Sequence, residues 1–237
     1  MSLEFLTPAA TAVARSPMER EALAAGAQIE LRDGWNVAVG FDGAQAERER
    51  CRTTAGFADR SHLGKLELQA SAADLAQIVS ACTGGEALEL GRGVRARDAW
   101  WCATSRERAL VFCEPSETAE LREQAEQAAA SAAGLASVID LTSTMAGITI
   151  AGPLAPEVFA RFTALDLRPQ STPVHGFRPG SVARTPAAVL REDDERWLMV
   201  FGAALGSYVW TVVADAAAGL GGGPVGVDAL EEVPASA

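Results

Sequence analysis

The same succession of strand, helix, hairpin and helix patterns occurs twice along this chain. This repeat restricts the possible fold more than any other feature of the sequence. In the first pass, apolar residues alternate from Leu66, and a helical, a hairpin and a second helical pattern follow. In the second pass, Ile148 and Ile150 take the places of Leu66 and Leu68 before the same succession. We therefore predict an α+β protein of two pseudo-duplicated β-α-β-β-α units. The alternative is chance similarity between two ordinary α+β stretches.

Turn signals place the predicted hairpins and the limits of the two units. Residues 26–41 alternate about Asp33-Gly34, which is typical of a tight hairpin turn. Each unit has one further hairpin pattern, at 98–115 and at 187–201. We expect the pseudo-repeats at about 65–140 and 148–227, within one domain of residues 16–237 that follows a flexible arm of residues 1–15.

Capping residues indicate where the helices begin and end. Residues 44–53 are charged and helical in pattern. Ser71 is expected to cap a helix that Gly84-Gly85 ends. Ser116 is expected to cap a long Ala/Glu-rich helix that Gly134 closes. The last long helix is expected from Ser207 to Ala218.

The charge and the distribution of apolar residues limit the partners of the chain. Its net charge is −11, and an acidic surface repels phosphate backbones, which argues against nucleic acid as a partner. There is no run of about 18 apolar residues, so we expect no segment that spans a membrane. Residues 1–15 lack the basic start and apolar stretch of a signal peptide, and we expect a cytoplasmic protein.

The cysteines and histidines do not suggest a metal site or a disulfide framework. There is no Cys-x-x-Cys pair among the four cysteines, Cys51, Cys82, Cys102 and Cys113. We expect free thiols in a reducing compartment. The two histidines, His62 and His175, are far apart and lack clustered cysteines, so no metal is expected. No dinucleotide-binding fingerprint is present, so we expect no flavin or nicotinamide on this chain.

Four segments of the chain resemble segments of one known protein family, in the same order. Residues 16–41, SPMEREALAAGAQIELRDGWNVAVGF, are similar to the opening of that family. Residues 52–68, RTTAGFADRSHLGKLEL, are similar to its aromatic-x-Asp-x-Ser-His segment. Residues 147–162, GITIAGPLAPEVFARF, resemble a later strand, Gly-Pro turn and helix, and residues 221–232, GGGPVGVDALEE, resemble the Pro-x-Gly turn before the last helix. The family that these segments resemble is the glycine cleavage T-protein (aminomethyltransferase) family.

This resemblance implies an α+β fold around a central folate pocket, with tetrahydrofolate as a possible cofactor. The family's relatives include folate-binding domains of sarcosine and dimethylglycine oxidases. They also include the γ subunit of heterotetrameric sarcosine oxidase, which this chain resembles most in its short length. The family's C-terminal barrel domain is not represented in the 237 residues. The implied context is tetrahydrofolate-linked one-carbon and amine metabolism.

The chain departs from the family pattern at the positions that carry its chemistry. The family has an acidic pair after a Gly-Gly turn, whereas the register here falls on Arg97-Asp98 in GVRARDAWW. The family's Arg-x-Gly-Tyr-Thr-Gly-Glu segment begins here at Arg184-Thr185 and continues as PAAVLRE, without the glycines, tyrosine and glutamate. The arginine that the family has in its last helix is also absent, because residues 226–230 run directly into Glu231.

On this resemblance, Asp98 is the candidate catalytic residue, and the candidate substrate-binding residues are Leu63, Trp100, Trp101 and Arg184. Asp98 either polarises a folate nitrogen or is a solvated hairpin aspartate beside Arg95 and Arg97, and we favour the second role. An indole stacks well on a pterin, but Trp100 and Trp101 point to opposite faces of a strand. We therefore favour a role in the core or an interface for the tryptophans.

Three other features have alternative interpretations. A side-chain hydrogen bond to the backbone is a better interpretation of His62 than a catalytic base. Arg92, Arg95 and Arg97 either grip the glutamate tail of a folate or pair with acidic residues of the chain. The run Gly221-Gly222-Gly223-Pro224 is interpreted as a flexible turn, because it lacks the Gly-Lys-Ser/Thr ending of a phosphate loop.

Two functions from different classes follow from these observations. The first is a non-catalytic subunit, similar to sarcosine oxidase γ, that works against a larger oxidase subunit or a second copy of itself. The second is an aminomethyltransferase-like enzyme that acts directly on tetrahydrofolate; the missing groups favour the first. The helix at 207–218 is apolar on more than one face, and the expected interface anchors are Trp100, Trp101, Trp197, Tyr208 and Trp210.

Overall fold

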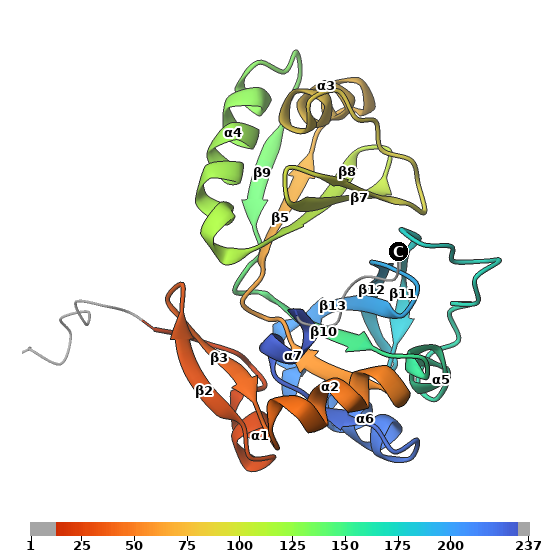
Figure 1. The fold of residues 1–237 in the computed structure, drawn as a ribbon. Coiled ribbons are helices and arrows are strands. Elements are labelled where there is room, and N and C mark those ends of the chain that lie inside the picture. The colour runs from red at the N-terminus through yellow and green to blue at the C-terminus, as the bar shows by residue number, and fades with distance from the viewer. Residues whose placement is uncertain (1–12, 232–237) are drawn as a thin grey trace, which may run out of the picture.

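The structure is a computed structural model that describes residues 13–231. It confirms the predicted α+β class, with strands in three sheets and helices packed against them (Figure 1). Residues 1–12 of the predicted N-terminal arm and residues 232–237 of the predicted domain lie outside the described residues.

A small N-terminal sheet of order β1-β3-β2 precedes the two units. Its strands are β1 (Ala14–Arg15), β2 (Gln28–Arg32) and β3 (Trp35–Gly40), and its neighbouring helices are α1 (Glu19–Ala24) and α2 (Ala44–Thr53). The hairpin predicted about Asp33-Gly34 is confirmed. The φ angles of these two residues are 47° and 79°, as the tight turn between paired Arg32 and Trp35 requires.

The first unit is built on a five-stranded sheet of order β6-β7-β8-β5-β9. Its strands are β5 (Gly64–Gln69), β6 (Gly93–Ala96), β7 (Ala99–Ser105), β8 (Arg108–Cys113) and β9 (Ser137–Asp140). Its helices are α3 (Ala72–Thr83) and α4 (Thr118–Ala130). The Ser71 side chain caps α3 by accepting the Asp74 N–H, and Gly84 ends this helix with a φ of 81°, as predicted.

The ends of α4 differ from the prediction. A short 3-10 turn, η2 (Pro115–Glu117), precedes the helix, and the Ser116 hydroxyl donates to the Glu117 carboxylate at 3.3 Å. The predicted Ser116 cap is wrong, because Ser116 lies inside the tighter 3-10 turn that Pro115 starts, before the first residue of the helix. The helix ends at Ala130, and the Asp74 carboxylate binds the N–H groups of Ala133 and Gly134 beyond it, at 3.0 and 3.2 Å.

The second unit is built on a six-stranded sheet of order β11-β12-β13-β10-β4-β14. Its strands are β4 (Gly56–Asp59), β10 (Met145–Ala151), β11 (Phe177–Val182), β12 (Thr185–Arg191), β13 (Arg196–Gly202) and β14 (Gly223–Pro224). Its helical segments are α5 (Ala155–Ala160), η3 (Ala203–Leu205), α6 (Gly206–Ala218) and α7 (Val227–Glu231). The second predicted hairpin, β12–β13, and the helix predicted at 207–218 are therefore confirmed.

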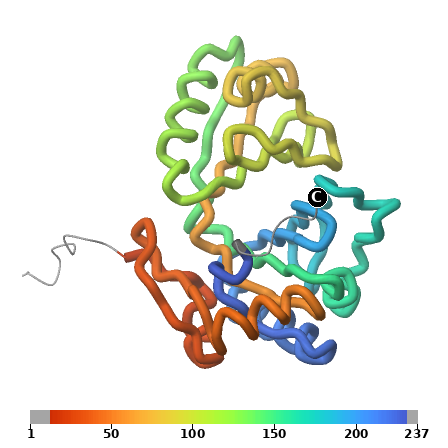
Figure 2. Tube along the Cα trace, viewed as in Figure 1, coloured from red at the N-terminus to blue at the C-terminus, as the bar shows by residue number. Residues whose placement is uncertain are grey.

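The two units share one strand order, which confirms the pseudo-duplicated fold. The order is β6-β7-β8-β5 in the first unit and β11-β12-β13-β10 in the second. A short strand precedes each unit in the chain and pairs with the sheet of the other unit. β4 precedes the first unit and pairs with β10 of the second, and β9 precedes the second unit and pairs with β5 of the first (Figure 2). The pairings are reciprocal, because Leu66 lies opposite Asp140 and Ile148 lies opposite Asp59. An approximate twofold axis therefore relates the units.

The sheets are also joined at their other ends by a second reciprocal contact. The Gly93 N–H donates to the carbonyl of His175 at 2.7 Å, and the Phe177 N–H donates to the carbonyl of Gly91 at 2.9 Å. Gly91 and His175 both have positive φ, 85° and 64°. The equivalent strands β6 and β11 thus begin at one shared backbone joint.

Apolar clusters on both faces of each sheet give the layers. Helices α3 and α4 cover the outer face of the first sheet, and α5 and α6 cover the outer face of the second (Figure 1). The inner faces meet in a third cluster, here called the inter-sheet cluster. Its buried members are Leu63, Trp100, Cys102, Leu110, Phe112, Phe177, Ala188, Leu190, Leu198 and Val200.

The predicted interface aromatics prove to be mostly core residues. The side chains of Trp100, Trp101, Trp197 and Trp210 are at most 6% exposed, and Tyr208, at 48%, is the exception. The prediction that the tryptophans anchor a partner is therefore wrong. The rings are covered within one chain, because helices and the facing sheet pack on them.

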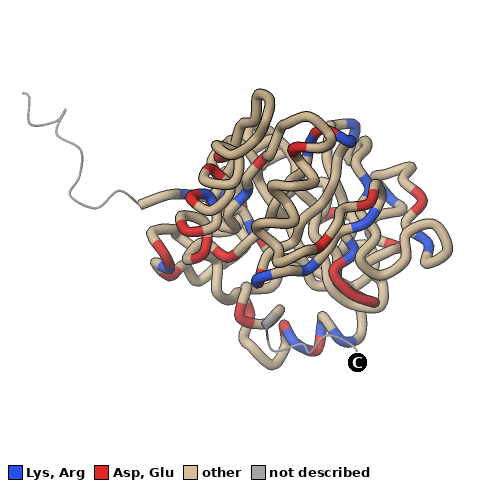
Figure 3. The backbone as a smooth tube through the Cα atoms, turned by 90° about the horizontal axis from the view of Figure 1, so that it is seen from above, with Lys and Arg blue, Asp and Glu red and all other residues tan. Residues whose placement is uncertain are grey.

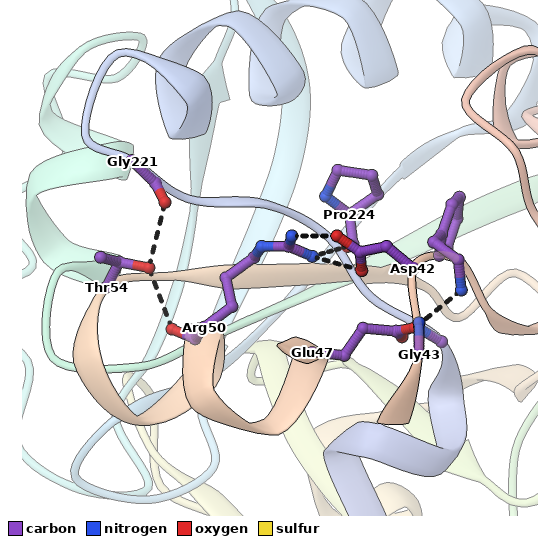
Figure 4. Close-up of polar contacts among 9 residues, drawn as sticks. Asp42, Gly43, Glu47, Arg50, Thr54, Gly221 and Pro224 are labelled. Carbon is purple, nitrogen blue, oxygen red and sulfur yellow. Dashed lines mark hydrogen bonds and ion pairs between the residues drawn. The ribbon is translucent and has the colours of Figure 1, made fainter. Parts of the chain in front are cut away.

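A buried carboxylate fastens the N-terminal hairpin to the end of the second unit (Figure 4). Glu47 on α2 is 1% exposed and accepts the N–H groups of Phe41, Gly43 and Gly226 at 2.7, 3.1 and 2.6 Å. Arg50, one turn later, binds the Asp42 carboxylate at 2.6 Å and the Pro224 carbonyl at 2.7 Å. The Gly-Gly-Gly-Pro turn was predicted to be flexible, but it is held by the Arg50 hydrogen bond to Pro224 and by the pairing of β14 with β4.

Charges of both signs are scattered along the backbone in the view from above (Figure 3). Within the described residues, no helix is both long and apolar enough to cross a membrane.

Candidate functional site

The candidate catalytic residue Asp98 lies in the turn of the β6–β7 hairpin. Arg97 and Asp98 have φ angles of 48° and 56°, and they connect the paired residues Ala96 and Ala99. The Asp98 side chain is 90% exposed and lies 3.9 Å from the Arg95 guanidinium. A carboxylate held this loosely is well solvated, in agreement with the favoured interpretation as a hairpin aspartate.

The adjacent tryptophans of β7 point into different layers, as the strand alternation predicts. Trp101 lies in the outer core under α3 and α4, and its indole N–H donates to the Ala96 carbonyl at 3.3 Å. Trp100 lies in the inter-sheet cluster. It meets the His175 ring edge-on at a centroid distance of 5.0 Å, and the Arg95 guanidinium lies 5.5 Å from its ring. Only Trp100 is therefore placed near Asp98.

A small cleft brings three of the predicted site residues together. Leu63, Asp98 and Trp100 line a space of about 20 Å³ at the rim of the inter-sheet cluster. The other lining residues are Arg60, Arg95, Phe112, Cys113, Glu114, Glu192 and Leu198. A space of this size holds about one water molecule. Drug-sized ligands commonly occupy pockets of about 300–1,000 Å³.

Arg60 supplies the buried charge of this cleft. Its side chain is 7% exposed and forms an ion pair with Glu114 at 2.8 Å. The Arg60 Nε has no hydrogen-bond partner among the described residues. A buried guanidinium that keeps an unused donor is costly and provides a point for anion or water binding.

Arg184 and Trp101 are not among the described residues that line this cleft. Arg184 lies in the β11–β12 turn, where Ala183 and Arg184 have φ angles of 48° and 60°. This turn corresponds by the twofold relationship to the turn that holds Asp98. The predicted substrate-binding residues are thus divided: Leu63 and Trp100 line the cleft, Arg184 lies on a hairpin tip, and Trp101 lies in the outer core.

The arginines considered as a grip for a folate tail also separate. Arg92 lies at the joint between the sheets, opposite Gly176. Arg97 donates to the Gln124 side chain at 3.1 Å, and Arg95 is shared between Asp98 and Trp100. Arg95 thus has an acidic partner, as the second interpretation expects, whereas the partner of Arg97 is a side-chain amide.

The sequence analysis missed a buried polar cluster where the chain crosses between the units. Asp59 accepts hydrogen bonds from the Ser16 hydroxyl and, at 2.9 Å, from the Ser61 N–H. Burial raises the pKa of Asp59, and these hydrogen bonds partly oppose the shift. Lys65 is fully buried, and its Nζ donates to the carbonyls of Ser61 and Leu63 at 2.9 and 2.7 Å. Burial lowers the pKa of Lys65 to about 8.

His62 lies beside this cluster without the hydrogen bond that the sequence analysis favoured. Among the described residues, no hydrogen bond to its ring is present. Burial, together with the cations Arg60 and Lys65, lowers the pKa of His62 to about 3. A signal for the cluster was available in the Asp59-x-Ser61 pattern followed by a lysine, Lys65, in an apolar strand.

The described residues contain no group of three or more histidine, cysteine or acidic side chains that is able to hold a metal ion. The four cysteines are free, as predicted, and all four are buried.

The fold and the cleft at the rim of the inter-sheet cluster define a two-unit α+β protein whose central space is narrow and polar at one edge. Residues 18–234 match the family model described as the GCVT N-terminal domain, and the chain belongs to this family. Two solved structures share this fold. The glycine cleavage aminomethyltransferase T of Bartonella henselae superposes with a TM-score of 0.77 at 15% identity, over 92% of this chain and 61% of the other. A chain of heterotetrameric sarcosine oxidase from a Corynebacterium species superposes with a TM-score of 0.67 at 18% identity, over 87% and 96%.

Curated relatives match shorter parts of the sequence. An aminomethyltransferase of Desulforamulus reducens is 24% identical over 163 residues, which are 65% of this chain and 44% of that protein. One from a Picosynechococcus species is 41% identical over 54 residues, which are 23% of this chain and 15% of that protein. The matches therefore span less than half of the length of these relatives.

Proposed function

We propose that this chain is a non-catalytic accessory subunit of tetrahydrofolate-linked one-carbon or amine metabolism, similar in role to the γ subunit of sarcosine oxidase. The packed centre of the molecule carries this proposal. The family resemblance implies a central folate pocket, but the ten side chains of the inter-sheet cluster occupy the space between the sheets here. The cleft at their rim measures about 20 Å³, too small for a pterin.

The arrangement of the candidate residues gives further support. General acid or base catalysis requires a side chain held within hydrogen-bond reach of the reacting atom. Asp98 is 90% exposed on a hairpin tip, and its only ionic partner in the described residues is Arg95 at 3.9 Å. The other predicted contact, Arg184, lies on a second hairpin tip. The groups that the family chemistry requires are thus neither complete nor assembled.

The likeness to a chain of heterotetrameric sarcosine oxidase supports a subunit that works against another protein. That superposition covers 87% of this chain. The sarcosine oxidase chain is part of a heterotetramer. A larger oxidase subunit in the cytoplasm, which carries any flavin itself, is the partner that this proposal assigns.

Titration calorimetry with 5-formyl-tetrahydrofolate, a stable folate, tests the proposal. We expect no binding by the purified chain under conditions in which a family aminomethyltransferase binds. Co-expression with a large oxidase subunit should yield a stoichiometric complex. Saturable folate binding that is lost in the Trp100→Ala variant, while circular dichroism shows the fold intact, would contradict the accessory role.

The second candidate function is a tetrahydrofolate-dependent aminomethyltransferase-like enzyme. One observation favours it: Leu63, Asp98 and Trp100 share one cleft with the incompletely paired Arg60. This function predicts methylene-tetrahydrofolate formation from an aminomethylated carrier protein, and loss of that activity in the Asp98→Asn variant.

A further inference from the structure

The outer side of the first unit contains a cavity of about 340 Å³ beside α3. Its walls are one side of α3, residues 85–90 of the segment that follows this helix, and the end of β7. The volume falls within the range of about 300–1,000 Å³ that is common for pockets that hold small molecules. None of the described residues lines both this cavity and the cleft at Asp98 and Trp100, so the two are separate.

The lining of this space, here called the α3 cavity, is mainly apolar. Its larger apolar side chains and the alanines between them are Leu75, Ala76, Val79, Leu88, Leu90 and Ala103. Glu86 and Arg106, both exposed, add one charge of each sign to the lining. The lining therefore has no net charge, and it favours neither an anion nor a cation.

The internal duplication explains why this space is open in the first unit. The same row of three paired residues crosses both sheets. It is Leu68, Ala109 and Ala103 in the first sheet and Ile150, Trp197 and Arg191 in the second. Ala103 therefore takes the place of Arg191, whose guanidinium lies 5.1 Å from the Trp197 ring. Two alanines in the first unit replace two of the largest side chains of the second.

In the second unit, the chain itself covers the equivalent region. Residues 161–176, which join α5 to β11, form a longer segment than residues 84–92, which join α3 to β6. Leu167 of the longer segment is 6% exposed and belongs to the outer core. The Arg191 guanidinium donates to the Thr172 carbonyl of the same segment at 3.0 Å. Side chains of the chain itself thus fill this place in the second unit.

The shorter segment of the first unit covers less of its sheet. Leu88 packs against the outer core, whereas Leu90 is 59% exposed beside the α3 cavity. Apolar surface in contact with water is unfavourable, and a ligand that covers it recovers that free energy. The place that the second unit fills by itself is therefore left for another occupant in the first.

We propose that the α3 cavity binds one uncharged, mainly apolar small molecule, such as a fused-ring or short-chain compound. Its apolar part lies against Leu75, Val79 and Leu90, and the half-buried Ser80 provides a hydroxyl for one polar group. Exclusion of water from the apolar lining is the main source of affinity. This inference is independent of the proposed accessory function and of folate binding, because the cavity lies on the outer side of the sheet.

Two dyes of nearly the same shape test the chemical class of the ligand. N-Phenyl-1-naphthylamine is uncharged, and its fluorescence rises in apolar surroundings. We expect it to bind the full chain at one saturable site. 8-Anilino-1-naphthalenesulfonate has the same rings and a sulfonate, and we expect at least about tenfold weaker binding, because burying a charge without a partner is costly. An excess of 5-formyl-tetrahydrofolate should not displace the uncharged dye.

Two pairs of variants locate the site. Ala76→Phe fills the cavity from the exposed side of α3, and it should weaken binding of the uncharged dye at least about tenfold. Its matched control is Ala81→Phe, at an exposed position of the same helix that does not line the cavity. Leu90→Asp places a charge at the cavity and should also weaken binding. Its matched control is Leu135→Asp, at a 94% exposed position of the same unit. Both controls should bind as the unmodified chain does.

Circular dichroism of each variant verifies that the fold is retained. Failure of the uncharged dye to saturate, or equal losses in a variant and its matched control, would overturn the proposal. Equal or tighter binding of the sulfonate would overturn the uncharged class of ligand. Displacement of the dye by the folate would place the dye in the inter-sheet space instead. The calorimetric folate titration of the accessory function gives its own result whichever of these outcomes is found.

Discussion

Asp59 and Asp140 occupy equivalent positions in the two units and make the same local hydrogen bond in opposite environments. Each ends the leading strand of its unit, and each carboxylate accepts the N–H of the residue two positions later at 2.9 Å. Asp59 is buried and also accepts from the Ser16 hydroxyl. Asp140 is exposed and lies 3.7 Å from Arg122. The same local hydrogen bond is therefore expected to contribute differently to stability at the buried and at the exposed aspartate.

This pair gives the first prediction. Asp59→Ala leaves the Ser16 hydroxyl and the Ser61 N–H without their acceptor and removes a negative charge near the buried Lys65, and we expect a loss of about 2 kcal/mol in the free energy of unfolding. Asp140→Ala should cost about 0.5 kcal/mol, because water replaces an exposed contact. Urea unfolding of both variants measures the difference. Equal losses would show that the crossing cluster has no special role in stability.

Glu47 gives a second stability prediction. Its removal leaves the N–H of buried Gly226 and the N–H groups of Phe41 and Gly43 without this acceptor, so Glu47→Ala should lower the free energy of unfolding by about 3 kcal/mol. Glu49→Ala, on the exposed side of the same helix, is the matched control and should change it by less than about 0.5 kcal/mol. Thermal melts followed by circular dichroism report both values. A melting temperature of Glu47→Ala within error of the control would refute this reading of the network.

His62 predicts a specific pH dependence of stability. Its pKa is about 3 in the folded chain and about 6.5 when unfolded, so between these values the unfolded state binds a proton that the folded state does not. The contribution of His62 therefore falls as the pH is lowered from 6.5 towards 3. Urea midpoints from pH 7 to pH 4 should decline less steeply in His62→Gln than in the unmodified chain. Parallel curves would mean that the ring is accessible to protons in the folded state.

The two hairpin tips predict small gains in stability. Asp98 and Arg184 occupy the second position of tight turns with positive φ, where glycine is favoured. Asp98→Gly and Arg184→Gly should each raise the free energy of unfolding by about 0.5 kcal/mol. Arg106→Gly, in the β7–β8 turn without a positive φ, should lower it slightly, because glycine adds entropy to the unfolded chain. A loss at either tip would indicate that its side chain makes a contact that stabilises the turn.

The sequence predicted the direction of the two adjacent tryptophans in the candidate site but not their burial. Alternation along β7 was sufficient to separate Trp100 from Trp101, because neighbouring strand residues always point to opposite faces. It was not sufficient to show that both rings are buried in one chain. That outcome depends on α3 and α4 covering one face and the second sheet covering the other. Exposure depends on these distant partners, so the prediction of free interface tryptophans was wrong.

By itself, the sequence determined the order of the elements, the duplication and the family. The order and the duplication depend on local periodicity, turn residues and caps, as in the Asp33-Gly34 hairpin and the Ser71 cap. The family followed from the resemblance of whole segments, such as residues 52–68. Only the tertiary structure decided that β4 and β9 exchange between the units, that Lys65 is fully buried, and that the inter-sheet space is closed around Trp100. Strand pairing and burial are set by residues far apart in the chain, and a local pattern does not record which distant surface will cover it.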